Sequence, residues 1–365
     1  MVKIKEIIQI FEKLAPLSLQ EQYDNSGLLV GNSDKVCTGA LLTIDTTEEI
    51  VDEAESKGLN LIISHHPVIF SGVKSFTGKN YVERTIIKAI EKGIAILAVH
   101  TNLDSVYEGV NYKICEKFNL TSPKILSPTK GILKKLVTFV PAEHIEKVRN
   151  AVFDAGAGHI GNYESCSYNL SGKGSFKASD TSNPFVGQKG KIHFEDEIRF
   201  ETIFPQYIQH AVIDALIKNH PYEEVAFDIY PLDNEFSKAG MGMVGNLAED
   251  MDEIEFLDLL KKLFKIPFIK HTKLPGKKIK RVAVCGGSGS FLLKEAIKSG
   301  ADIFVSGDFK YHQFFDAENK ILVADIGHFE SEQYTKEIFY DILTKKFPNF
   351  AVHFSEVNTN PVYYF

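Results

Sequence analysis

The same order of structural elements occurs twice in this sequence, once near each end. Residues 39–66 indicate a buried strand, an amphipathic helix that ends near Gly58, and a second buried strand. Residues 281–309 repeat this order, with Gly300 in the place of Gly58. A repeat of this length predicts two α/β halves related by approximate two-fold symmetry. Side chains at the strand ends of both halves would then meet in one cleft.

A segment of different character separates the two halves, and stretches rich in turn residues flank it on both sides. Its apolar pattern gives the order strand, helix, strand, strand, helix, strand, which matches the ferredoxin-like pattern. We therefore predict an α/β protein with an inserted ferredoxin-like α+β domain. The predicted parts are 1–130 for the first half, 131–232 for the inserted domain and 233–365 for the second half.

Composition and charge exclude several classes of protein. The chain has 365 residues, 44% of them hydrophobic, which predicts two or three domains with a large core. A net charge of -7 argues against general binding of nucleic acid. Four scattered cysteines without a C-x-x-C pair indicate a reducing compartment. The N-terminal segment reads as an amphipathic helix, and the apolar runs are too short for a membrane span, so we expect a cytoplasmic protein.

Two adjacent histidines, His65 and His66, follow a buried strand of the first half. At a turn promoted by Pro67 they could bind two neighbouring metal ions, one each, although a pair of surface histidines is an equally good interpretation of this motif alone. Asp104 follows the next strand. Its carboxylate suits a position between two cations, while by itself it would be interpreted as an ordinary loop or helix-capping aspartate.

The second half contributes His328 and Glu332, which follow a predicted strand at the start of a helix. Four residues apart, they would project from one helical face towards one point. A strand-end histidine and a glutamate favoured by the helix dipole are the ordinary alternatives. With His65, His66 and Asp104 they make a mixed nitrogen and oxygen ligand set, which suits zinc, iron, manganese or nickel. The pattern predicts two divalent metal ions side by side.

Three further residues are candidates for roles around this centre. Asp308 and His312 are also four apart and could be direct ligands. The repeat places Asp308 opposite His66, so we assign Asp308, His312 and His100 to orienting the ligand imidazoles or to proton transfer. The glycine-rich run 285–290 could hold a phosphate at a helix start, but a tight strand-to-helix turn is the preferred interpretation.

Taken together, these motifs resemble the NIF-three-like family of dinuclear metal proteins, whose members are commonly called GTP cyclohydrolase 1 type 2 homologues. The resemblance covers almost the whole chain. Tyr23 stands where the family often has tryptophan, so an aromatic residue is retained. The matching motifs are YDNSGLLVG (23–31), SHHPVIF (64–70), HTNLDS (100–105), CGGSGS (285–290), SGDFKYH (306–312) and DIGHFESE (325–332).

The resemblance implies a function as well as a fold. It carries His65, His66, Asp104, His328 and Glu332 over as ligands of two metal ions per chain, with zinc as the first choice. It also implies a toroidal homohexamer and an inserted domain similar to CutA and to nitrogen-regulatory proteins. The expected activity is metal-dependent hydrolysis of a nucleotide-like substrate such as GTP, or of a phosphoester. A non-catalytic, ring-shaped metal-binding or regulatory protein is the alternative.

Overall fold

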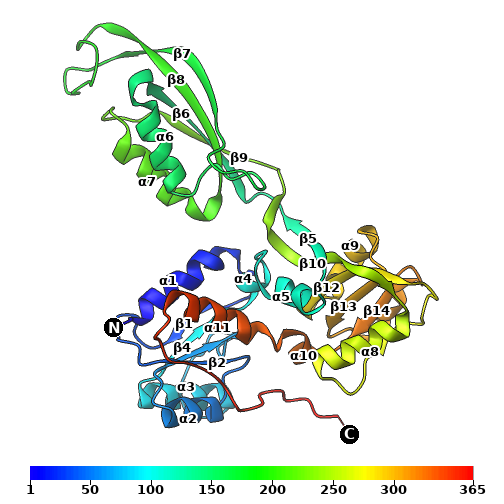
Figure 1. The fold of residues 1–365 in the computed structure, drawn as a ribbon. Coiled ribbons are helices and arrows are strands. Elements are labelled where there is room, and N and C mark those ends of the chain that lie inside the picture. Colours follow the sequence, from blue (N-terminus) through cyan, green and yellow to red (C-terminus); the bar gives the residue numbers. More distant parts are fainter. Residues whose placement is uncertain (365) are drawn as a thin grey trace. The chain divides into compact units, whose positions relative to one another are not determined.

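The computed structural model describes residues 1–364 and divides the chain into two compact units. The first unit combines Met1–Pro128 with the chain from Lys238 onwards, and the second unit is Thr129–Ser237. Figure 1 shows the elements of each unit. The predicted insert, 131–232, falls within the second unit.

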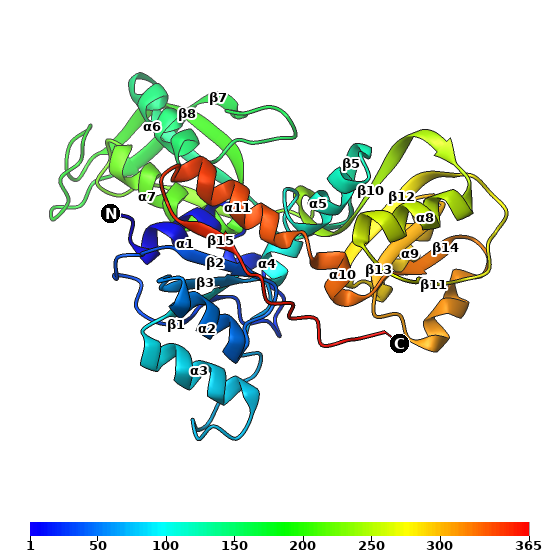
Figure 2. The ribbon, with the colours of Figure 1, turned by 60° about the horizontal axis from the view of Figure 1, so that its bottom comes forward.

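A five-stranded sheet forms one half of the first unit, with order β1-β4-β3-β2-β15. All neighbouring strands are parallel except for β1, which runs antiparallel to β4. Helices α2 and α3 cover one face, and α1 and α11 cover the other (Figure 2). The bounds are β1 Gly27–Val30, β2 Ala40–Thr43, β3 Leu61–Ser64, β4 Ala95–Ala98, β15 Val352–Phe354, α1 Ile4–Leu14, α2 Glu48–Ser56, α3 Tyr81–Lys92 and α11 Thr335–Lys346.

A six-stranded sheet forms the other half, with order β11-β14-β13-β12-β10-β5. Its parallel strands β12, β13 and β14 correspond to β2, β3 and β4, so the two predicted copies form matching βαβ units. The bounds are β5 Thr121–Thr129, β10 Phe236–Met251, β11 Lys270–His271, β12 Ile279–Ser288, β13 Ile303–Gly307, β14 Leu322–Asp325, α5 Val110–Lys117, α8 Glu253–Phe264, α9 Leu293–Lys298 and α10 His328–Glu332. The shorter helices are α4 Thr101–Asp104, η1 Leu17–Leu19, η4 Ser290–Leu292 and η5 Tyr311–Ala317.

One apolar core joins both sheets of the first unit. Leu42 and Ile63 from the first sheet and Val282 and Val305 from the second are buried in the same cluster. Successive side chains of a strand point to opposite faces, so strands covered on both faces are buried along their whole length and mostly apolar, as β2, β3 and β13 are. Each fully buried aliphatic side chain stabilises the fold by about 1.5–3 kcal/mol.

The second unit has a four-stranded antiparallel sheet with order β7-β8-β6-β9. Helices α6 and α7 pack against it around Leu136, Phe200, Phe204 and Val212. The bounds are β6 Leu133–Pro141, η2 Ala142–His144, α6 Ile145–Asp154, β7 Tyr168–Lys177, β8 Ile192–Pro205, η3 Gln206–Ile208, α7 Gln209–Asn219 and β9 Phe227–Pro231.

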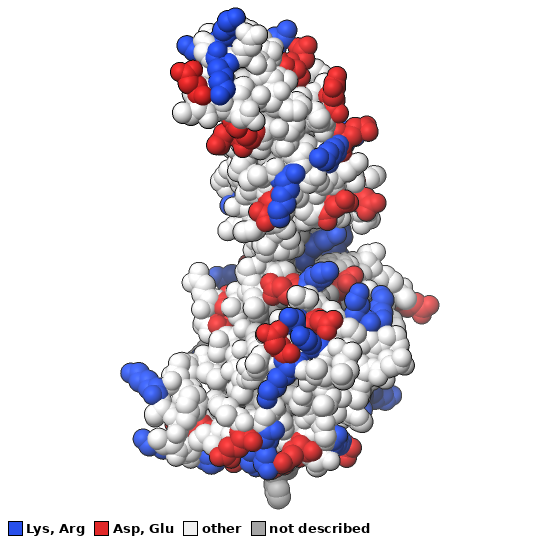
Figure 3. Space-filling model, turned by 90° about the vertical axis from the view of Figure 1, so that its left-hand side faces the viewer, with Lys and Arg blue, Asp and Glu red and all other residues white. Residues whose placement is uncertain are grey.

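The distribution of surface charge and the character of the helices bear on what the protein can bind. On the face shown in Figure 3, basic and acidic side chains are intermixed, without a continuous basic area. Among the described residues, no helix combines the length and the apolar character that crossing a membrane requires.

Candidate metal centre

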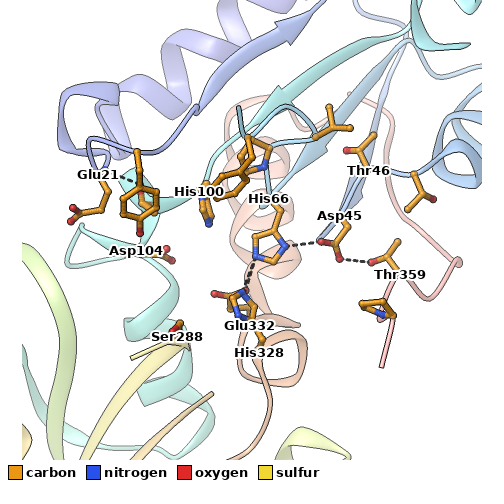
Figure 4. Close-up of a pocket in the computed structure, with 18 of the residues that line it drawn as sticks. Glu21, Asp45, Thr46, His66, His100, Asp104, Ser288, His328, Glu332 and Thr359 are labelled. Atoms are coloured by element: carbon orange, nitrogen blue, oxygen red, sulfur yellow. Dashed lines mark hydrogen bonds and ion pairs between the residues drawn. The ribbon is translucent and has the colours of Figure 1, made fainter. Parts of the chain in front are cut away.

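The predicted ligands lie where strands of the first unit end. His65 and His66 directly follow β3, Asp104 ends the short helix α4 after β4, and α10 begins at His328 and ends at Glu332. Parallel strands present their carboxyl ends at one edge of a sheet, which brings these side chains together. Figure 4 shows His66, Asp104, His328 and Glu332 around one space.

The ligand atoms form two groups that share Glu332. In the first, Nε2 of His65 lies 3.7 Å from Oδ1 of Asp104 and 3.6 Å from Oε1 of Glu332. In the second, Nε2 of His66 and Nε2 of His328 lie 2.9 Å and 3.3 Å from Oε2 of Glu332. Either group could hold a metal ion, since the ligand atoms within it lie within 4.8 Å of one another. Glu332 therefore occupies the shared position that the sequence had suggested for Asp104.

Two atoms of the first group lack hydrogen-bond partners although they are buried. These are Nε2 of His65 and Oδ1 of Asp104. A buried polar atom without a partner costs about 1–3 kcal/mol, so such atoms need a ligand to be stable. A divalent cation would satisfy the lone pairs of both. The donor set and its orphaned atoms thus fit a metal ion.

The second ring nitrogen of each ligand histidine, Nδ1, already has a hydrogen-bond partner. Nδ1 of His66 lies 2.7 Å from Oδ1 of Asp45, and Nδ1 of His328 lies 2.6 Å from Oδ2 of Asp308. Nδ1 of His65 lies 2.9 Å from the Val99 carbonyl oxygen. When Nδ1 donates its proton to such an acceptor, the neutral ring presents an unprotonated Nε2, which is the state that binds metal.

The carboxylates also change the pKa values of the imidazoles. Burial lowers the pKa of His66, but its hydrogen bonds to Asp45 and Glu332 outweigh burial and raise that pKa to about 10. The same balance, with Glu332 and Asp308 as partners, raises the pKa of His328 to about 9. Without metal, the cluster therefore retains protons, and metal ions must displace them.

His100 lies beside the two groups, and a buried aspartate orients it. Its ring belongs to a third cluster with His65 and His66. Nδ1 of His100 lies 2.7 Å from Oδ1 of Asp24. Burial raises the pKa of Asp24, but the hydrogen bonds from His100 and Thr101 outweigh it and keep that pKa well below its usual value. Nε2 of His100 is thus directed towards the metal ligands.

His312 is not brought to the centre. It lies in η5, is exposed, and contacts the rings of Tyr311 and Phe315. Asp308 has a positive φ of 58°, and the 3-10 helix η5 starts only at Tyr311, so the helical spacing assumed for Asp308 and His312 does not apply. Asp308 contacts His328 instead of joining a ligand group.

Sequence reasoning missed Asp24 and Asp45. Asp45 follows β2 at the same sheet edge as the histidines, and this position could have identified it. Asp24 lies in a loop before β1. Its role depends on a contact with His100, which is 76 positions away in the sequence. The YDNSG motif was the only available signal for it.

The glycine-rich run at the end of β12 approaches the centre closely. A Cβ atom on Gly287 would lie 2.3 Å from Oε1 of Glu332, and this residue has a φ of 62°. Glycine is therefore needed here for close approach and for backbone conformation. Cys285, Gly286 and Ser288 line a cavity of about 1020 Å³, and His66 and Glu332 line the same cavity.

Comparisons with known proteins agree with this architecture. The family model described as Duf34/NIF3 (NGG1p interacting factor 3) matches residues 2–361. A "GTP cyclohydrolase 1 type 2 homolog" of Halalkalibacterium halodurans is 39% identical over 360 residues, which cover 97% of each protein. The protein with the same description from Bacillus subtilis is 39% identical over 367 residues, covering 98% of this chain and 97% of that protein.

Solved structures extend the similarity to the whole fold. A Bacillus cereus protein related to NIF3 has a TM-score of 0.86 and 36% identity, covering 100% of this chain and 99% of that one. A Staphylococcus aureus protein has a TM-score of 0.78 and 30% identity, with the same coverage. These similarities extend over both units, and they give no support to the more specific expectation that the second unit is like CutA.

Proposed function

Because the chain belongs to the Duf34/NIF3 family, we propose that it binds two divalent metal ions side by side and acts as a metal-dependent hydrolase. The ligands in this proposal are His65, Asp104 and Glu332 for one ion, and His66, His328 and Glu332 for the other. One observation supports it most strongly: a single carboxylate, Glu332, offers one oxygen to each of two histidine-containing groups.

The mixed nitrogen and oxygen donors favour zinc, with iron, manganese or nickel as alternatives. When bound, two such ions would supply Lewis acidity that lowers the pKa of water and polarises a substrate. His100 is the proposed proton-transfer residue, because Asp24 fixes its ring beside the ligands. Asp308 is proposed to orient His328, and His312 has no role in this proposal because it is exposed and outside the groups.

A nucleotide-like molecule is the proposed starting substrate, since the curated relatives carry the description GTP cyclohydrolase 1 type 2 homolog. Two hydrolytic outcomes are distinguishable with metal-loaded protein and GTP. Release of formate indicates opening of the guanine ring, and release of phosphate indicates hydrolysis of a phosphoanhydride bond, that is, attack on a phosphoryl group. Either activity should disappear in Asp104→Ala. The absence of both products with GTP and with a panel of other small molecules would contradict a hydrolase.

A non-catalytic metal-binding or regulatory protein is the second candidate, and one observation favours it. The second unit is compact by itself and has its own cavity of about 710 Å³, lined by residues including Phe139, Phe176 and Arg199. A regulator would bind a ligand there without turnover. Hours-long incubation of metal-loaded protein with candidate ligands, followed by mass analysis of the ligand, separates binding from catalysis.

We also propose that the second unit is an inserted ferredoxin-like domain. Its strand-helix-strand-strand-helix-strand order and its antiparallel sheet order support this assignment. Self-association as a toroidal hexamer and a cytoplasmic location complete the proposal. Light scattering after gel filtration tests the hexamer, which predicts about six times the chain mass of 40.9 kDa.

A further inference from the structure

Aromatic rings line the cavity of the metal centre and yet are exposed. The exposed fractions of Tyr23 and Phe70 are 65% and 51%, and those of Tyr81 and Phe291 are 59% and 61%. They come from four separate segments, so one protruding loop does not explain their exposure. Large apolar surfaces gathered in one place of a protein typically mark a binding site.

Two of these rings are connected to the metal ligands through a series of ring contacts. The rings of Tyr23 and Phe70 are nearly parallel, with an interplanar angle of 16° and centroids 6.5 Å apart. The Phe70 ring meets the His100 ring edge to face at 5.6 Å, and the His100 ring lies 5.3 Å from that of His66. A planar group stacked on Tyr23 or Phe70 would therefore lie beside the proposed metal ligands.

Hydrogen bonds fix the loops that carry these two rings. Nδ2 of Asn25 donates to the Ile69 carbonyl oxygen at 2.7 Å, which ties the residues next to Tyr23 and Phe70 together. Asp24 accepts from Thr101 and contacts His100, which ties the same loop to the end of β4. Binding to rings that are already held in place loses less conformational entropy.

The charges that line the cavity determine which ring-bearing molecules fit. Its lining carries six carboxylates and one guanidinium, that of Arg84, whose Nε donates to Glu48 at 2.8 Å. With neutral histidines, even the four positive charges of two divalent ions would leave one net negative charge. A triphosphate is itself strongly anionic, so a lining with a net negative charge and a single guanidinium that is already paired disfavours it. The lining carboxylates are Glu21, Asp45, Glu48, Glu49, Asp104 and Glu332.

We propose that this cavity binds a planar heteroaromatic compound that is neutral or cationic, stacked on Tyr23 and Phe70, and that a triphosphate group adds nothing to its affinity. The inference rests on the proposed function, because it names the substrate class of the same metal centre. In this proposal the aromatic ring of the ligand provides the affinity, and the phosphate groups contribute none.

The test measures equilibrium binding to zinc-loaded full-length protein at fixed ionic strength. The panel contains purine, pyrimidine and pyridine bases, their nucleosides and the corresponding 5′-triphosphates. We expect ring compounds to bind, each triphosphate binding no more tightly than its nucleoside. Tyr23→Ala and Phe70→Ala should each weaken binding at least about fivefold, the scale of base stacking on an aromatic side chain. Tyr23→Phe, which keeps the ring, should bind as wild type does.

Two controls make the outcome decisive. Tyr163→Ala removes a ring that is 75% exposed in the second unit, and it should leave binding unchanged. Metal content should stay at the wild-type value in both ring variants, so a chain without metal would contradict the proposed function and not the ring site. With metal present, the inference is overturned if no ring compound binds, if the alanine variants bind normally, or if triphosphates bind tenfold more tightly than nucleosides.

Discussion

Oε2 of Glu332 lies 2.9 Å from Nε2 of His66, while Oε1 of the same carboxylate faces the unpaired Nε2 of His65. One side chain thus connects the two adjacent histidines that follow β3 to a helix from the other half of the first unit. Glu332 is the residue that both ligand groups share, so its loss should affect both proposed metal ions.

Glu332→Gln should therefore reduce the affinity for both metal ions, because the amide keeps the shape of the side chain but loses its charge and one oxygen ligand. The metal content after dialysis should fall from about two ions per chain to below one. Glu337→Gln is the matched control: Glu337 lies on α11, pairs with Lys117 of α5 and belongs to no ligand group. Loss of only one ion in Glu332→Gln would show that the carboxylate serves one group alone.

Asp308→Gly should separate metal affinity from stability. Asp308 holds Nδ1 of His328, and removal of such an orienting partner typically lowers metal affinity about 10–100-fold. Its φ of 58° favours glycine, so the melting temperature of metal-free protein should stay level or rise. Asn119→Gly, at a φ of 53°, offers the same backbone relief away from the centre and should leave metal binding intact. Unchanged affinity in Asp308→Gly would refute the orienting role.

Gly287→Ala should damage the centre through a steric contact. The added Cβ would lie 2.3 Å from Oε1 of Glu332, in addition to a backbone strain of about 1–3 kcal/mol. Gly300→Ala is a matched control, because Gly300 also has a positive φ, 75°, but nothing lies within 4 Å of its Cβ position. Metal titration by calorimetry should show weaker binding only for Gly287→Ala. Equal metal affinity in both variants would contradict this prediction, because it would mean that Glu332 can shift away from the added Cβ and still bind metal.

The second unit should lose stability in mild acid through His220. Nε2 of this buried histidine donates to the Phe139 carbonyl oxygen, and its Nδ1 accepts from the Tyr222 amide, so protonation would place a proton against that amide. Burial lowers the pKa of His220 in the folded state. Below about pH 6.5 the unfolded chain therefore binds the proton more readily, and stability falls by up to about 1.4 kcal/mol per pH unit.

Native-state hydrogen exchange of β6 at pH 7.5 and 5.5, corrected for the intrinsic exchange rate, measures this effect in the full chain. The opening free energy of wild type should fall at the lower pH, and His220→Gln should fall less. An equal fall in both proteins would assign the acid sensitivity to other groups.

Much of this architecture follows from local sequence signals. The βαβ units come from apolar runs and helix periodicity, and the adjacent histidines and the His328–Glu332 spacing identify ligands on separate elements. The family resemblance is confirmed across residues 2–361. The position of Glu332 between the groups could not be predicted, because it depends on how α10 meets β3. The α-helical spacing assumed for Asp308 and His312 does not hold, because Asp308 has a left-handed conformation and η5 starts only at Tyr311.

The most direct test of the paired centre is the number of metal ions per chain, measured by plasma mass spectrometry on untagged protein reconstituted with zinc. We expect about two ions in wild type and a sharp decrease in Asp104→Ala, which removes an oxygen that is buried without a partner. A wild-type protein that remains free of metal after reconstitution would contradict the paired metal centre, and so would an Asp104→Ala variant that still holds two ions.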